Sequence, residues 1–105
     1  MGIFREEIFG PVLGVSRVNT LDDAVERANS SIYGLAAAIY SDSVDETIAL
    51  SRRLKAGNIY INAHGLVDPT MPFGGLGASG FGKDMGPEQL DGFLSTKSVY
   101  VQLNR

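Results

Sequence analysis

The sequence predicts an α/β fold whose centre is a partial parallel sheet with the element order β-α-β-α-β. Two observations support this prediction. Three short apolar segments, at residues 11–19, 35–41 and 58–62, have the composition of β-strands, and a helical pattern separates each segment from the next. Strands that are joined through helices form parallel sheets with right-handed crossovers. A long glycine-rich loop, a short helix and a terminal strand complete the predicted chain.

The first strand is predicted at residues 11–19 and the first helix from Thr20 onward. The strand segment, PVLGVSRVN, is rich in valine and follows Gly10. Thr20 and Asp23 have the spacing of a capping box, and acidic side chains are favoured in the first turn of a helix. The face of this helix that we expect to be buried consists of apolar residues at helical spacing: Leu21, Ala24, Val25 and Ala28.

A second strand, helix and strand are predicted between residues 35 and 62. The apolar run LAAAIYS, at residues 35–41, is typical of a parallel strand that is buried on both faces. Ser43 and Glu46 form a second capping box, and the helix that they open is predicted to end at Gly57. Two crossovers and one later helix cannot cover both faces of such a sheet, so we expect some apolar surface to remain exposed.

The last third of the chain is predicted to be a loop, a short helix and a strand. Residues 63–86 show neither helical nor alternating periodicity, yet they are too apolar for a solvated linker. Pro87 is suited to the first turn of a short helix. Residues 98–103 alternate between apolar and polar, which predicts an edge strand that can pair with another subunit. The predicted division is therefore a domain at 1–97 and an oligomerisation strand at 98–105.

Composition excludes several classes of function. The formal charge of −3 and the absence of a long basic block argue against nucleic acid or an acidic membrane as a partner. The longest apolar run is far below the roughly 18 residues that cross a bilayer. With no leader pattern at the start and no cysteine in the chain, the expected location is cytoplasmic. The missing cysteine also excludes a thiolate nucleophile or a cysteine-bound metal supplied by this chain.

The segment PFGGLGASGFGK, at residues 72–83, raises the question of phosphate binding. It contains the pattern G-x-G-x-x-G, but no predicted strand leads into it and no helix begins within it, as a dinucleotide site requires. A P-loop is also disfavoured, because Asp84 stands where a serine or threonine would bind Mg²⁺. We therefore interpret the glycines as positions where backbone passes close to backbone, forming the wall of a site.

Two further positions are notable, although their residue types alone do not establish a role. Glu6 and Glu7 precede Phe9 and a Gly-Pro turn, and two such carboxylates are either hydroxyl ligands or a solvated chain start, with the second favoured on physical grounds. His64 is the only histidine and has no nucleophile or carboxylate at motif spacing. It directly follows a predicted parallel strand, however, and ligands bind at that edge of open α/β sheets.

Several motifs, taken together in their order and spacing, closely resemble the C-terminal part of the NAD(P)-dependent aldehyde dehydrogenases. They are EEIFGP at residues 6–11, YGL at 33–35, AGNIYIN at 56–62, PFGG at 72–75 and SGFGKD at 79–84. The resemblance covers essentially the entire chain. The stretch NAHGLVDP, at residues 62–69, is most similar to dehydrogenases of aryl-substituted acetaldehydes.

The resemblance implies roles for individual residues. Glu7 would hydrogen-bond the ribose hydroxyls of NAD or NADP, and Phe9 would contact the nicotinamide ring. Phe73 would form an aromatic wall near the substrate entrance. The other positions that match the substrate tunnel of the family are Ala63, His64, Leu66 and Val67. Residues 98–103 resemble the strand through which family members join a neighbouring subunit.

The resemblance also implies what the chain lacks. In the family, the cysteine nucleophile, the glutamate base, the asparagine of the oxyanion site and the Rossmann domain precede this region. The resemblance therefore predicts part of an enzyme, with no turnover and no tight cofactor binding by the chain alone. The alternative is an assembly module that associates with itself or with full-length subunits through residues 98–103.

Overall fold

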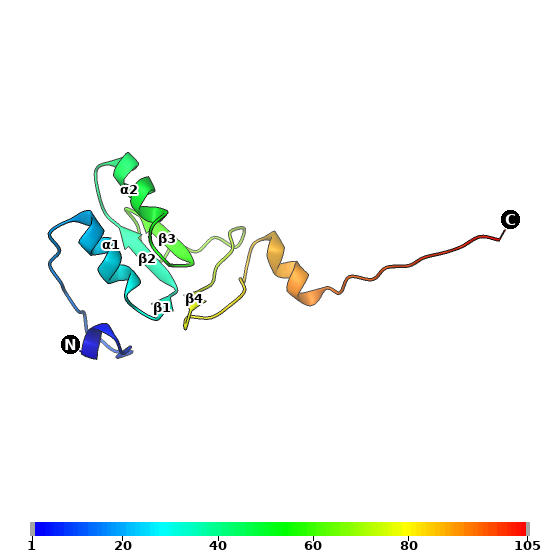
Figure 1. Ribbon diagram of the computed structural model, residues 1–105, viewed down its shortest axis with the longest axis horizontal. Coiled ribbons are helices and arrows are strands. Elements are labelled where there is room, and N and C mark those ends of the chain that lie inside the picture. Colours follow the sequence, from blue (N-terminus) through cyan, green and yellow to red (C-terminus); the bar gives the residue numbers. More distant parts are fainter. Residues whose placement is uncertain (1, 105) are drawn as a thin grey trace.

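The computed structural model describes residues 2–104. Met1, the first residue of the predicted domain at 1–97, and Arg105, the last residue of the predicted strand at 98–105, lie outside the described residues. In chain order the elements are η1 (Gly2–Phe4), α1 (Leu21–Asn29), β1 (Tyr33–Gly34), β2 (Ala36–Ile39), α2 (Val44–Ser51), β3 (Asn58–Ile61), β4 (Leu76–Gly77) and η2 (Pro87–Phe93). The molecule is elongated, with extents of 76 × 32 × 23 Å. Two helices and the strands form one body, from which η2 and an extended tail project (Figure 1).

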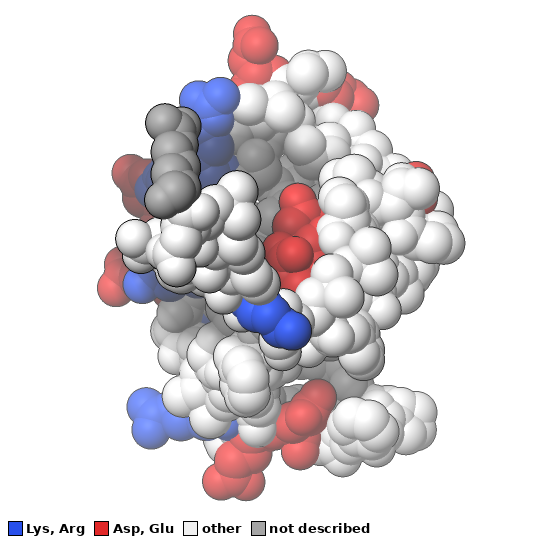
Figure 2. Space-filling model, turned by 90° about the vertical axis from the view of Figure 1, so that its right-hand side faces the viewer, with Lys and Arg blue, Asp and Glu red and all other residues white. Residues whose placement is uncertain are grey.

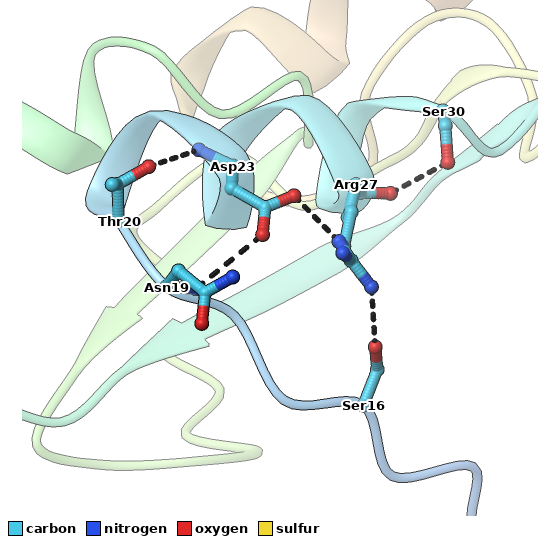
Figure 3. Close-up of polar contacts among 6 residues, drawn as sticks. All are labelled: Ser16, Asn19, Thr20, Asp23, Arg27 and Ser30. Carbon is cyan, nitrogen blue, oxygen red and sulfur yellow. Dashed lines mark hydrogen bonds and ion pairs between the residues drawn. The ribbon is translucent and has the colours of Figure 1, made fainter.

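Helix α1 begins where the capping box predicts. The hydroxyl of Thr20 accepts a hydrogen bond from the backbone N–H of Asp23 at 3.1 Å. Asp23 in turn accepts one from the guanidinium of Arg27 at 2.6 Å, one turn further along the helix (Figure 3). Arg27 also donates to the hydroxyl of Ser16 at 2.9 Å, which joins the preceding segment to the helix. These polar contacts satisfy the helix start and orient the chain that enters it.

The centre of the body is the parallel pair of β2 and β3. Ala36 lies opposite Asn58 and Ile39 lies opposite Ile61, so the predicted pairing of residues 35–41 with 58–62 is confirmed. Helix α2 connects the two strands and is capped by the hydroxyl of Ser43, which accepts from the backbone N–H of Glu46 at 3.3 Å. The α-helix ends at Ser51 rather than near Gly57, because the next residues form turns. The second predicted capping box is thus confirmed, and the helix is shorter than predicted.

The structure differs from the prediction in the first strand, whereas the short helix after Pro87 is present and the pairing of residues 98–103 with another subunit stays a prediction. Residues 11–19 are extended but belong to no strand, so the first strand of the predicted β-α-β-α-β order is absent from the described part of the chain. Residues 98–103 likewise pair with no strand within residues 2–104. The short helix after Pro87 is a 3₁₀-helix. Strands need a ladder partner, and a favourable local pattern cannot supply one.

The hydrophobic core is small for the amount of apolar sequence. Val25 of α1 and Ile39 of β2 are its buried hydrophobic residues, and Thr47 of α2 is fully enclosed. Of the predicted buried face of α1, Leu21 and Ala28 are exposed, so that prediction holds for Val25 and fails for these two. The expectation that apolar surface would remain uncovered is confirmed by the exposed large side chains along residues 8–18 and 90–103. No helix among residues 2–104 is long and apolar enough to span a membrane.

Candidate functional site

Backbone hydrogen bonds between its two ends hold the glycine-rich loop in shape. Phe73 and Asp84 exchange two backbone hydrogen bonds, of 2.7 and 2.8 Å, which close the loop. Its middle pairs with the body, because β4 forms an antiparallel ladder with β1. The backbone N–H of Ala78 also donates to the carbonyl of Ile32 at 2.9 Å, and the hydroxyl of Ser79 accepts from the backbone N–H of Gly34 at 3.0 Å. The antiparallel β1–β4 pair was not predicted from sequence.

The lysine of this loop is occupied by the loop itself. The ammonium of Lys83 donates to the carbonyl of Gly74 at 2.9 Å and lies 3.5 Å from that of Gly75. The side-chain amide of Asn58 donates to the same Gly74 carbonyl at 3.1 Å. Because these donors point at backbone oxygens, the loop lacks the free lysine of a phosphate cradle, which agrees with the rejection of a P-loop.

Glycine is required both where the loop meets the body, at Gly57, and within the loop, at Gly75. A Cβ atom added to Gly57 would lie 1.8 Å from the carbonyl oxygen of Gly74, and one added to Gly75 would lie 2.4 Å from the carbonyl oxygen of Ser79. No side chain fits at either position without moving backbone. This close approach is what the sequence analysis proposed for the glycines.

Three of the predicted tunnel residues line one hollow, which we call the Phe73 hollow. Leu66, Val67 and Phe73 border it, and its volume is about 370 Å³. Its apolar lining also includes Ile59 and Tyr60 of β3 and Met71 and Pro72 of the loop. Such a concave, mainly apolar and aromatic surface is suited to an apolar ligand.

The other two predicted tunnel residues do not line the Phe73 hollow. Ala63 is half-buried and His64 is exposed. The ring of His64 meets that of Tyr60 edge to face, with centroids 6.0 Å apart. The chain turns at Asn62, whose φ is 51° and whose side chain bonds the backbone N–H and carbonyl of Ser41 at 3.0 and 2.9 Å. His64 therefore contacts Tyr60, which lines the hollow, but does not line the hollow itself.

The predicted cofactor residues do not line the Phe73 hollow. Glu7 borders a second hollow, of about 450 Å³, together with Ala28, Tyr33 and Ser79; we call it the Glu7 hollow. Phe9 does not line it and is 93% exposed, with a φ of 51°. The structure therefore does not bring Glu7 and Phe9 into one hollow.

A third hollow shares lining residues with each of the first two. It is formed by the glycine-rich loop, and it shares Leu35 and Ser79 with the Glu7 hollow and Phe73 with the Phe73 hollow. Residues of the glycine-rich loop therefore line both the hollow that contains Glu7 and the hollow that contains Phe73. Sequence reasoning missed Asn58, Ser79 and Lys83 as residues that shape this region, because hydrogen bonds from side chain to distant backbone leave no local pattern.

Electrostatics of the Phe73 hollow is dominated by one carboxylate. Asp68 borders it, and hydrogen bonds from the backbone N–H and hydroxyl of Thr70, at 2.8 and 2.7 Å, hold the pKa of Asp68 below its usual value. On the face shown in Figure 2, lysine and arginine side chains are scattered among acidic ones and form no patch. Within residues 2–104 no group of three or more histidine or acidic side chains could hold a metal ion.

The family model, the curated relatives and the solved structures that match this chain identify the same family. The sequence model of the aldehyde dehydrogenase family matches residues 1–99. A putative aldehyde dehydrogenase of Bacillus subtilis is 44% identical over 103 residues, which is 98% of this chain and 21% of that protein. The chain thus spans about a fifth of the length of the curated relatives that it matches.

Solved structures give the same result. An aldehyde dehydrogenase of Bacillus cereus in complex with NAD⁺ matches with a TM-score of 0.92 and 39% identity, covering 99% of this chain and 21% of that one. The indole-3-acetaldehyde dehydrogenase AldA of P. syringae, in complex with NAD⁺ and IAA, matches with a TM-score of 0.87 and 38% identity, covering 94% and 20% of the two chains. The α/β fold of this chain is therefore the fold of the corresponding part of these enzymes.

Proposed function

The chain belongs to the aldehyde dehydrogenase family, and from this premise we propose that it forms part of an NAD(P)-dependent enzyme that oxidises an aldehyde to a carboxylic acid. The observation that supports this proposal best is the position of the glycine-rich loop, which borders both the Glu7 hollow and the Phe73 hollow. A hydride transfer requires that cofactor and aldehyde meet, and one loop that borders both hollows can set their separation.

The Glu7 hollow fits one end of the cofactor. An ionised carboxylate accepts hydrogen bonds from two neighbouring hydroxyls, which is the chemistry of a ribose, and the hollow beside Glu7 has a volume of about 450 Å³. We assign Phe9, whose ring is exposed, to contact with the nicotinamide. The bound cofactor supplies the hydride acceptor. The ammonium of Lys83 bonds a backbone carbonyl, and we propose that the phosphates of the cofactor are held by segments outside this chain.

The Phe73 hollow fits an aldehyde with an apolar, aromatic body. Phe73, Leu66 and Val67 supply apolar walls, and Tyr60 adds a second aromatic side chain to the lining. We therefore propose an aryl-substituted acetaldehyde as substrate. The similarity to a protein named an indole-3-acetaldehyde dehydrogenase supports this choice. Ala63 and His64 would complete the tunnel beyond Tyr60.

Catalysis needs groups that this chain lacks. It contains no cysteine, so the thiolate that attacks the aldehyde must come from outside it. We propose that the chain alone has no turnover and that it acts within a complete dehydrogenase, meaning this chain together with the family segments that it lacks. We also propose that residues 98–103, which are extended and exposed, join a neighbouring subunit.

Two measurements test the proposal. An antibody raised against residues 68–83 should detect a protein several times heavier than this chain in its source cell, whereas a band at the mass of the chain would contradict the proposed larger enzyme. In the complete dehydrogenase, Glu7→Gln should raise KM for NAD roughly tenfold, because a neutral amide replaces the ionised acceptor. Glu6→Gln is the control, and equal effects of both variants would refute the role of Glu7.

A further inference from the structure

We propose that Lys83 and Asn58 are positioning residues that set the aromatic wall at Phe73 by fixing the carbonyl of Gly74. The inference rests on the proposed function, in which Phe73 borders the aldehyde. Gly74 directly follows Phe73, and its carbonyl is the one backbone oxygen of the described loop that receives both a charged and a neutral side-chain donor.

The two donors approach Gly74 from different parts of the fold. Lys83 comes from the far end of the same loop, and its ammonium lies 2.9 Å from the oxygen of Gly74. Asn58 begins β3, and its amide also donates to the carbonyl of Leu35 at 2.8 Å, just before β2. A carbonyl oxygen has two lone pairs, and here each has a donor. The position of Gly74 is therefore determined jointly by the loop and by the parallel strands.

The remaining backbone of Phe73 is held as well. Its N–H and carbonyl are paired with Asp84, next to Lys83, at 2.7 and 2.8 Å. Beneath Gly74 the contact with Gly57 leaves no room for a Cβ atom, so the loop lies directly on the body. Hydrogen bonds therefore hold the backbone of Phe73 and of Gly74. Because the backbone is fixed, the direction of the Phe73 side chain is fixed as well, and Phe73 borders the hollow of about 370 Å³.

A charged donor is needed for this arrangement. A hydrogen bond from an ammonium is stronger than one from an amide, and losing it leaves a half-buried carbonyl with one partner fewer. Lys83→Met keeps an unbranched apolar side chain of nearly the same length and removes the donor, whereas Lys83→Arg keeps a charged donor. Lys55→Met is the matched control, since Lys55 is exposed at the end of the α2 region and its ammonium donates to no group described in residues 2–104.

The first arm measures steady-state kinetics of the complete dehydrogenase with phenylacetaldehyde and NAD. Lys83→Met should raise KM for phenylacetaldehyde roughly tenfold and leave KM for NAD unchanged, and Lys83→Arg should restore most of the loss. A purely structural role would instead lower the concentration of active enzyme, which reduces apparent kcat at constant KM. That result, or a Lys83→Met enzyme that behaves like Lys55→Met, would overturn the inference.

A second arm separates this inference from the proposed function. If Phe73→Ala leaves KM for phenylacetaldehyde unchanged, the proposed substrate wall is wrong; if Phe73→Ala raises it and Lys83→Met does not, only the positioning role is wrong. Amide hydrogen exchange of the full chain needs no turnover. Lys83→Met should speed exchange at Phe73 and Asp84 at least several-fold relative to Lys55→Met, and equal exchange rates would overturn the positioning role.

Discussion

At the scale of single residues, polar side chains of α1 hydrogen-bond the segment before it, which was predicted to be a strand. Residues 11–19 have no ladder partner, yet Arg27 reaches back to the hydroxyl of Ser16, and Asp23 accepts from the backbone N–H of Asn19 at 3.4 Å (Figure 3). The hydrogen bond from Arg27 is the main cause that holds the pKa of Asp23 below its usual value; desolvation opposes it, and the hydrogen bond from Asn19 and the charge of Arg27 add to the lowering. Asp23 thus links the entering segment, the cap and the helix.

The lowered pKa of Asp23 predicts an acid-sensitive helix. Because the folded-state pKa lies below the ordinary value of 3.8, the stabilisation is present above that value and is lost as the pH falls through the folded pKa. Asp23→Asn should lower the far-UV helical signal at about pH 7 and make its loss in acid shallower. Asp91→Asn is the control, and an acid transition of Asp23→Asn identical to that of the unaltered chain would contradict the role of Asp23.

At the scale of elements, the glycine-rich loop and the β2–β3 pair form one unit. The backbone N–H of Gly57 donates to the carbonyl of Gly34 at 3.0 Å, and Gly57 also meets Gly74 of the loop. The sequence indicated a glycine wall here, but it gave no sign of the short β1–β4 ladder. Two-residue strands carry too little pattern to be recognised, whereas capping boxes and runs of apolar residues are local signals that persist in the structure.

The contact at Gly57 predicts a steep cost for a single methyl group. Gly57→Ala places a Cβ atom 1.8 Å from the oxygen of Gly74 and 2.7 Å from the ammonium of Lys83, so the loop must shift. We expect the free energy of unfolding in urea to fall by about 1–3 kcal/mol. Gly92→Ala, where nothing lies within 4 Å, should change it by less than about 0.5 kcal/mol. Equal effects at the two positions would show that the loop does not rest on Gly57.

At the scale of the whole molecule, the fold leaves apolar residues without cover. The tail after η2 runs away from the body (Figure 1), and its large side chains are exposed. The parallel pair has few elements around it, which is unusual for parallel strands. Because the matched relatives are about five times longer, these surfaces are where we expect the remaining family segments and a neighbouring subunit to pack.

A charge introduced into residues 98–103 tests the proposed role of the tail in subunit association. Val101 lies on the apolar face of residues 98–103, with Val99 and Leu103, and Gln102 lies on the polar face. Val101→Lys should weaken subunit association of the complete dehydrogenase at least tenfold in analytical ultracentrifugation, because it places a charge on the apolar face that the pairing strand would bury. Gln102→Lys should leave association unchanged. A Val101→Lys enzyme that assembles like the unaltered one would remove these residues from the interface.

The sequence by itself determined the starts of the two capped helices, the strand character of residues 35–41 and 58–62 and the family, because caps, apolar runs and motif spacing are patterns of residues along the chain. Only the tertiary structure decided that residues 11–19 form no strand, that His64 lies outside the Phe73 hollow, and that Lys83 bonds the loop instead of a phosphate. Each of these outcomes depends on how the chain is arranged in three dimensions, and a local pattern does not specify which backbone group or hollow a side chain or strand will meet.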